Sequence, residues 1–305
     1  QPSPMPPPPP WPIWTAAFTL CAPKGPLSPQ RGTRACSAAL TEAAQQPTTR
    51  LRRIFGLKMI IADPDWTVAM KPKHFRYLWK FYKDKKQWLD QGGKITRVFR
   101  ILSDYSDSAG TVKGHYFHQD LLIARLIHDH NPKRHIDIAS RIDGFVAHVA
   151  SFRKIEVVDV RPLPKSEHEN IKFRQADLMN PQDLGQTDSL SCLHAIEHFG
   201  LGRYTDSIDV NGHIKGIKNL VGMVSDGGRL YLSFPIGQAD EVHFNAHRVF
   251  HVSSIFDHPS IQKHMTLQRF DYVDDRGDLH LDTSVTEVDR NIKYGCGIYT
   301  FEKSN

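Results

Sequence analysis

From His135 onward, short apolar runs alternate with stretches whose apolar residues recur at helical spacing. The apolar runs predict strands over residues 135–138, 155–160, 171–174, 189–193 and 229–234. Helical spacing predicts helices over residues 119–128, 145–152 and 214–224. Strands and helices in alternation predict an α/β fold with a doubly wound, mostly parallel sheet, which binds ligands at the carboxyl ends of its strands.

The end of the chain departs from this alternation. A helix is predicted near residues 252–256, followed by strands near 266–273 and 297–301. The last two strands are separated by a turn-forming run, Asp274 to Asp278, and a long polar segment. We therefore expect the sheet to close with an antiparallel strand pair.

Residues 1–58 differ in composition from the rest of the chain. Pro6 to Pro10 form a polyproline run, and the residues after it are rich in Ala, Ser, Thr, Gln and Pro. Such a composition buries too little apolar surface to offset the entropy of ordering. We predict a disordered or spurious leader and a natural start at Met59. A cytoplasmic location is expected, and organellar targeting by the leader stays open.

Residues 59–114 predict a helical, basic extension. Phe75, Leu78, Tyr82 and Leu89 fall near one face of a helix over residues 74–91. Lys71 to Arg100 contain ten Lys or Arg and two Asp. This charge suits a platform for an acidic polymer or membrane surface, or the solvated back of a packed helix. We favour the second interpretation.

Composition narrows the class of protein. Of 305 residues, 40% are hydrophobic and 24% charged, and the net charge of +6 does not by itself imply a nucleic-acid partner. No apolar run reaches the ~18 residues of a membrane span. The cysteines are widely spaced and form no CxxC pair, so we expect reduced thiols. They are Cys21, Cys36, Cys192 and Cys296.

Acidic residues recur where the predicted strands end. Asp137 lies in the first strand, Asp159 closes the second, and Asp177 follows the third. An acid at the tip of the second strand can accept both hydroxyls of a ribose. An acid after the third can accept from an adenine amino group. The three together predict a nucleoside-like ligand.

Residues 115–302 resemble the class I S-adenosylmethionine (SAM) methyltransferase superfamily, and within it the domain-of-unknown-function family 268. The matching strings are residues 116–120, 140–148, 197–204 and 244–250. The resemblance implies a Rossmann-like methyltransferase domain over residues 115–305, with SAM as its cofactor. It also implies a small polar acceptor, for which a sugar is one candidate.

The turn after the first strand departs from the superfamily pattern Asp-x-Gly-x-Gly-x-Gly. Ala139, Arg141 and Asp143 stand at the glycine positions, and Gly144 follows one step later. A dinucleotide such as NAD needs a glycine-rich loop to hold its phosphates, whereas SAM carries no phosphate. The loss of these glycines therefore disfavours NAD as the ligand. Arg141 could meet the SAM carboxylate. The cofactor-binding residues that we expect are Asp137, Ala139, Ser140, Arg141, Asp143, Gly144, Asp159, Val160, Asp177, Leu178 and His194.

The segment from His194 to Tyr204 carries the candidate chemistry. We expect His198 or His247 to take a proton from the acceptor and Glu197 to orient the base or hold the cofactor. Arg203, Tyr204 and Arg248 are candidates to bind a polar or anionic acceptor.

Two alternatives to a methyltransferase stay open. The degenerate turn motivates a non-catalytic relative that binds a nucleoside ligand. His194, Glu197 and His198 also spell H-x-x-E-H, a zinc-peptidase pattern that needs one helical face. That pattern motivates a metal-dependent hydrolase, although Gly200 and Gly202 leave little room for a helix.

Overall fold

The computed structural model describes residues 76–181 and 183–304. The chain divides into two units, residues 1–69 and 70–305. The first unit lies outside the described residues. So do the predicted leader and the first residues of the helix that we predicted over 74–91.

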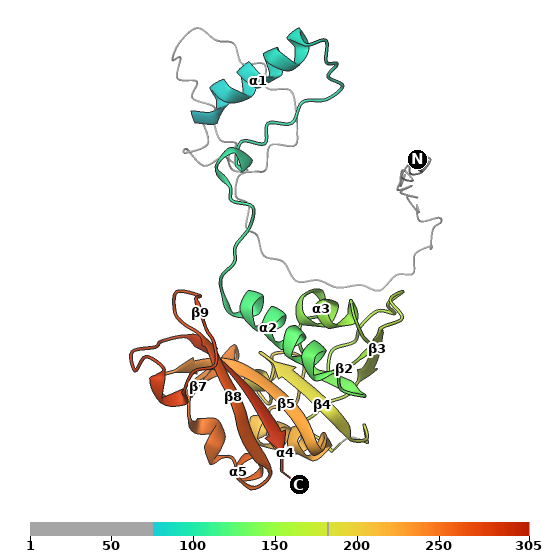
Figure 1. The fold of residues 1–305 in the computed structure, drawn as a ribbon, viewed down its shortest axis with the longest axis vertical. Coiled ribbons are helices and arrows are strands. Elements are labelled where there is room, and N and C mark those ends of the chain that lie inside the picture. Colours follow the sequence, from blue (N-terminus) through green and yellow to red (C-terminus); the bar gives the residue numbers. More distant parts are fainter. Residues whose placement is uncertain (1–75, 182, 305) are drawn as a thin grey trace, which may run out of the picture. The chain divides into compact units, whose positions relative to one another are not determined.

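The described part of the second unit is built on one sheet with the strand order β3-β2-β1-β4-β5-β10-β8-β9 (Figure 1). Strands β1 to β5 pair in parallel, whereas β10 runs antiparallel to both β5 and β8. This arrangement confirms the doubly wound, mostly parallel Rossmann-like methyltransferase sheet and its antiparallel final pair. The strands are β1 His135–Ile138, β2 Ile155–Asp159, β3 Ile171–Gln175, β4 Thr187–Leu193, β5 Val224–Gly237, β8 Met265–Val273, β9 Leu279–His280 and β10 Gly295–Lys303.

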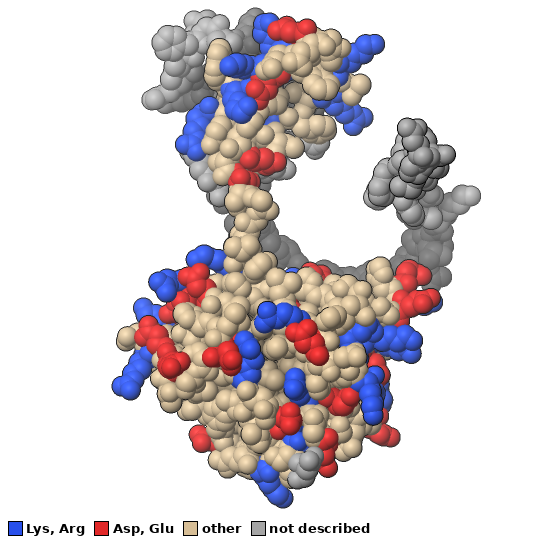
Figure 2. Space-filling model, viewed as in Figure 1, with Lys and Arg blue, Asp and Glu red and all other residues tan. Residues whose placement is uncertain are grey.

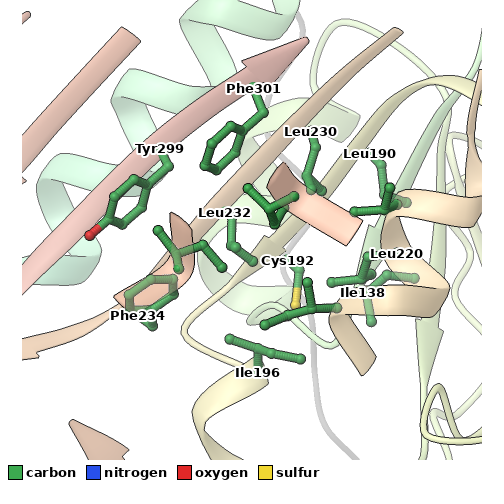
Figure 3. Packing of buried hydrophobic residues seen from close by; sticks show 14 of the residues in the cluster. Ile138, Leu190, Cys192, Ile196, Leu220, Leu230, Leu232, Phe234, Tyr299 and Phe301 are labelled. Carbon is green, nitrogen blue, oxygen red and sulfur yellow. The ribbon is translucent and has the colours of Figure 1, made fainter. Parts of the chain in front are cut away.

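Helices cover both faces of the sheet (Figure 1). Helix α2 (His115–His130), a π-helical turn (Ile142–Val146) and α3 (Ala147–Ala150) bury one hydrophobic cluster against it. Helix α4 (Gly212–Met223) and α5 (Pro259–His264) bury the second. Part of this second cluster appears in Figure 3, where Cys192 lies among aliphatic side chains. The strands β1, β2 and β4 are buried along almost their whole length because both faces of the sheet are covered there.

A small hairpin was not predicted. Strand β6 (Glu241–His243) pairs antiparallel with β7 (His247–His251), and β7 extends the sheet beside the end of β5. Strand β6 has only three residues, and all three are exposed. It is therefore too short to show the alternation of apolar and polar positions that predicts a strand. In place of the helix predicted over 252–256, a 3₁₀ turn spans Ser254–Asp257.

Helix α1 (Leu78–Asp90) lies within the helix predicted over residues 74–91. None of its residues is fully buried, Leu78 and Phe81 are half-buried, and Trp79 is 77% exposed. Two of its basic side chains pair one turn onward, Lys80 with Asp84 and Lys86 with Asp90. On the visible face of the α/β domain, Lys and Arg alternate with Asp and Glu and gather in no single patch (Figure 2). Within the described residues, no helix is long and apolar enough to cross a membrane.

Candidate functional site

A cavity of about 480 Å³ opens at the carboxyl ends of β1, β2 and β4. It lies where the strand order reverses between β1 and β4, which is the usual ligand position of such sheets. Twelve of the predicted site residues line it: Ala139, Arg141, Asp159, Val160, Asp177, Leu178, His194, Glu197, His198, Arg203, Tyr204 and His247.

The loop after β1 makes its turn without the usual glycines. Ala139 adopts a left-handed conformation with φ of 59°, which costs Ala more than Gly, although its small side chain limits the cost. The chain then enters the π-helical turn, where a Cβ on Gly144 would lie 2.6 Å from Asp120 Oδ2. Gly144 therefore lets the turn approach α2 closely. It does not line the cavity.

Asp137 is fully buried and fixes the loop after β1 through its hydrogen bonds. Its Oδ1 accepts hydrogen bonds from Ser140 Oγ and Ser191 Oγ, both at 2.6 Å. Burial raises the pKa of Asp137 to about 7, against the lowering effect of these hydrogen bonds. Asp137 and Ser140 are not among the lining residues, so they position the loop and do not face a ligand.

The two bulky replacements of glycine pair with each other. Arg141 Nη2 lies 3.0 Å from Asp143 Oδ2, and Asp143 is exposed outside the cavity. The guanidinium of Arg141 also lies 5.2 Å from the ring centroid of Tyr116, a cavity residue that was not predicted. Arg141 thus borders the cavity, while Asp143 faces solvent.

Asp159, the predicted ribose acid, is held by Arg161. The Arg161 backbone N–H donates to Oδ1 at 2.8 Å, and Nη2 donates to Oδ2 at 2.5 Å. The same guanidinium lies 4.6 Å from the ring centroid of Tyr204. We did not predict Arg161, and its place two residues after a strand-ending acid was the available signal. A ribose would have to share the carboxylate with this arginine.

Asp177 caps the turn after β3. Its Oδ1 accepts a hydrogen bond from the Met179 backbone N–H at 2.9 Å, and the residue borders the cavity beside Leu178. Asp159 and Asp177 thus border the same cavity, as the order of strand ends predicts.

The H-x-x-E-H residues do not form a zinc-peptidase helix. His194 follows β4 in a left-handed conformation, and a 3₁₀ turn of three residues, Ile196–His198, comes next. His194 Nδ1 lies 2.9 Å from Glu197 Oε1, whereas His198 Nδ1 points to the Ala246 carbonyl oxygen at 2.7 Å. The two imidazoles therefore do not present one pair of ligand atoms from a single helical face.

The side chain of His198 borders the cavity and is held in one tautomer. Because its Nδ1–H donates to the Ala246 carbonyl, the lone pair of the neutral ring lies on Nε2. Burial lowers the pKa of His198 from 6.5, and the Glu197 carboxylate opposes this effect. The ring of His247 lies 6.4 Å away, centroid to centroid, and also borders the cavity.

Arg248 does not line the cavity. It is buried, and its Nη1 donates to the Phe199 carbonyl oxygen at 2.7 Å. It therefore supports the loop after β4 and does not reach an acceptor. His118, His213, His243 and His251 also lie outside the cavity lining.

Three unpredicted aromatic residues line the cavity: Tyr116, Phe199 and Tyr294. Tyr116 begins the string of residues 116–120 that resembles the family, so the sequence could have indicated it as a site residue. Tyr294 had no such signal, because it comes from a polar loop that only the fold brings beside His247, at 5.4 Å between ring centroids.

The loop after β4 depends on Gly200. It has φ of +78°, and a Cβ there would lie 2.0 Å from the Asp209 carbonyl oxygen. We predict that Gly200→Ala lowers the free energy of unfolding by about 2 kcal/mol or more, through strain and the clash. Urea denaturation measures the change.

The matched control is Gly222→Ala in α4. Gly222 is exposed, and a Cβ there meets nothing within 4 Å. It should be neutral or stabilising by up to about 1 kcal/mol, as expected for Gly to Ala in a helix. Equal stability of the two variants would contradict the role assigned to Gly200.

Comparison with known proteins agrees with the resemblance. Residues 175–286 match the family model described as "Caenorhabditis protein of unknown function, DUF268". This match spans the predicted acceptor segment from His194 to Tyr204. A search of curated proteins finds no match.

Solved structures of methyltransferases are also similar. The N-methyltransferase NodS from Bradyrhizobium japonicum, in complex with S-adenosyl-L-homocysteine, is 13% identical, covers 74% of this chain and 99% of its own, and has a TM-score of 0.43. An S-adenosylmethionine-dependent methyltransferase from Clostridium acetobutylicum is 12% identical over 73% of this chain and 99% of its own, with a TM-score of 0.43. The fold assignment rests on the strand order and not on these likenesses.

Proposed function

We propose that this chain is a SAM-dependent methyltransferase that acts on oxygen or nitrogen of a small polar acceptor. The observation that carries the proposal is one cavity at the β1/β4 switch point, bordered by both Asp159 and Asp177. Its volume lies in the ordinary range of small-molecule sites. Solved methyltransferases with similar folds contain the demethylated product of SAM, which supports the same ligand here.

The cavity residues divide into a cofactor side and an acceptor side. Asp159, Val160, Asp177 and Leu178 would hold the nucleoside, and the loop at Ala139 and Arg141 would hold the amino-acid end. The sulfonium of SAM supplies a methyl group that is easily displaced. The protein supplies in-line orientation, which contributes through the entropy already lost on binding.

The acceptor side is polar and cationic. Arg203 and Tyr204 border the cavity beside His198, and the Arg203 guanidinium lies 5.2 Å from the Tyr204 ring centroid. This arrangement suits hydroxyl or anionic groups, and a sugar has both the size and the hydroxyls. Nε2 of His198 would receive the proton of an acceptor hydroxyl as the methyl group is transferred.

Calorimetry of the full chain with SAM and with its demethylated product tests the proposal. Binding in the micromolar range is expected for both, and NAD serves as the control that should not bind. Absence of binding for both SAM and its product would overturn the proposal.

One observation favours a second candidate, a methyltransferase-like protein that binds without catalysis. The carboxylate of Asp159 already accepts a bidentate hydrogen bond from Arg161. Micromolar SAM binding without methyl transfer to any of a panel of sugars and amines would favour this candidate.

A further inference from the structure

Two histidines and a cysteine from three distant parts of the chain meet beside the cavity. His115 begins α2, His194 follows β4, and Cys296 lies in β10. Their ligand atoms all lie within 4.8 Å of one another. Among residues 76–181 and 183–304, this is the one group of three or more His, Cys, Asp or Glu with such spacing.

The hydrogen bond of His194 directs its second nitrogen into this cluster. Glu197 Oε1 lies 2.9 Å from Nδ1, and Nε2 is buried without a hydrogen-bond partner in the described structure. A carboxylate that accepts from Nδ1–H leaves the lone pair of the neutral ring on Nε2. The same carboxylate–histidine arrangement orients histidine ligands in metal sites.

The other two ligands are equally constrained. Cys296 is fully buried, and its thiol has only long contacts, such as 3.8 Å from Sγ to Gln119 Oε1. The His115 ring is stacked between His194 and Tyr294, at centroid distances of 5.2 and 5.4 Å. The thiol thus makes only two weak hydrogen bonds, to Gln119 Oε1 and to the Gly297 carbonyl oxygen. Nε2 of His194, which faces this cluster, is the buried polar atom left without a geometric hydrogen bond, and that is costly without a ligand.

We propose that His115, His194 and Cys296 bind a zinc ion, with Glu197 as the residue that orients His194. Two imidazole nitrogens and one thiolate form a donor set that Zn²⁺ prefers. Binding releases the thiol proton of Cys296, and any proton on the two imidazoles, to solvent. A contraction of the cluster would bring the three atoms to ligand distance. The site shares His194 and Glu197 with the H-x-x-E-H pattern, but His115 and Cys296 take the place of His198.

Cobalt binding tests the site, because a thiolate bound to Co²⁺ gives a charge-transfer band in the near ultraviolet. The untagged full chain is treated with a chelator and titrated with Co²⁺, then with Zn²⁺ as the competitor. We expect one equivalent of Co²⁺ to produce the band and Zn²⁺ to abolish it. Absence of the band in the wild-type chain overturns the proposal.

Two variants and a matched control locate the ligands. Cys296→Ala should lose the band, whereas Cys192→Ala should keep it, because Cys192 lies in the apolar core away from the cluster (Figure 3). His115→Ala should weaken Co²⁺ affinity by about tenfold or more. His115 is only partly buried, so His115→Ala is expected to fold. It can therefore test the site even if Cys296→Ala fails to fold. Wild-type affinity in His115→Ala would overturn the assignment. Metal binding is measured without SAM, so its outcome is independent of the proposed activity.

Discussion

Replacing His198 with alanine is expected to lower kcat for methyl transfer to a hydroxyl by about 10²- to 10⁴-fold, the usual contribution of a general base. The ring is held in one tautomer by the Ala246 carbonyl, so Nε2 can take a proton as the acceptor loses it. SAM affinity should change by no more than about threefold, since the assigned role is proton transfer and not cofactor binding. Radiometric methyl transfer under saturating SAM measures the loss.

The pH profile of the wild-type enzyme provides a second test of His198. A general base must be neutral, so kcat/KM should rise with pH through the pKa of this histidine and then level off. Because burial lowers that pKa, the rise should be centred below the ordinary value of 6.5. The acidic limb should disappear in His198→Ala.

His251→Ala is the matched control, since His251 lies on the neighbouring strand β7 but outside the cavity lining. It should retain full activity. Full activity in His198→Ala, together with a large loss in His247→Ala, would contradict the assignment and transfer the role of the base to His247.

Asp159→Ala is expected to weaken SAM binding by about 10- to 100-fold, or about 1.4–2.8 kcal/mol. The reason is the loss of a nearly buried carboxylate that would accept the ribose hydroxyls. Calorimetry measures the change, and thermal denaturation checks that the variant remains folded after Arg161 has lost its partner. Asp257→Ala is the control, because Asp257 is an exposed acid outside the cavity and should leave affinity unchanged.

Arg161→Ala tests whether Arg161 competes with the ribose of SAM for the Asp159 carboxylate or helps the carboxylate to bind it. If a ribose displaces the guanidinium from Asp159, removal of the guanidinium should tighten SAM binding, since a charge-assisted hydrogen bond no longer has to be broken. Wild-type affinity in Asp159→Ala would contradict the ribose assignment for either behaviour of Arg161.

Much of the fold could be predicted because it is encoded locally. Short apolar runs located β1, β2 and β4 to within two residues, whereas β5 starts five residues before the strand predicted over 229–234. The position of Asp159 and Asp177 at strand ends followed from the same pattern, because parallel strands present their carboxyl ends at one edge.

The elements that escaped prediction carry little periodic signal. The first strand of the β6–β7 hairpin has only three residues, all exposed, and the hairpin was not predicted. Similarly, Arg248 looked like an acceptor ligand because Arg often is, but burial among carbonyl oxygens gives it a structural place. In each case a long-range contact, or the lack of one, overrides the local pattern.

The sequence by itself therefore determined the order of strands and helices and the edge of the sheet at which a ligand would bind. Only the tertiary structure decided which side chains share that edge. It paired Arg141 with Asp143, set Arg161 on Asp159, and brought Cys296 to His194 from about 100 residues away. The physical reason is that periodicity reports burial of one element at a time, whereas hydrogen bonds and metal ligation depend on distances between elements that only the packed sheet defines.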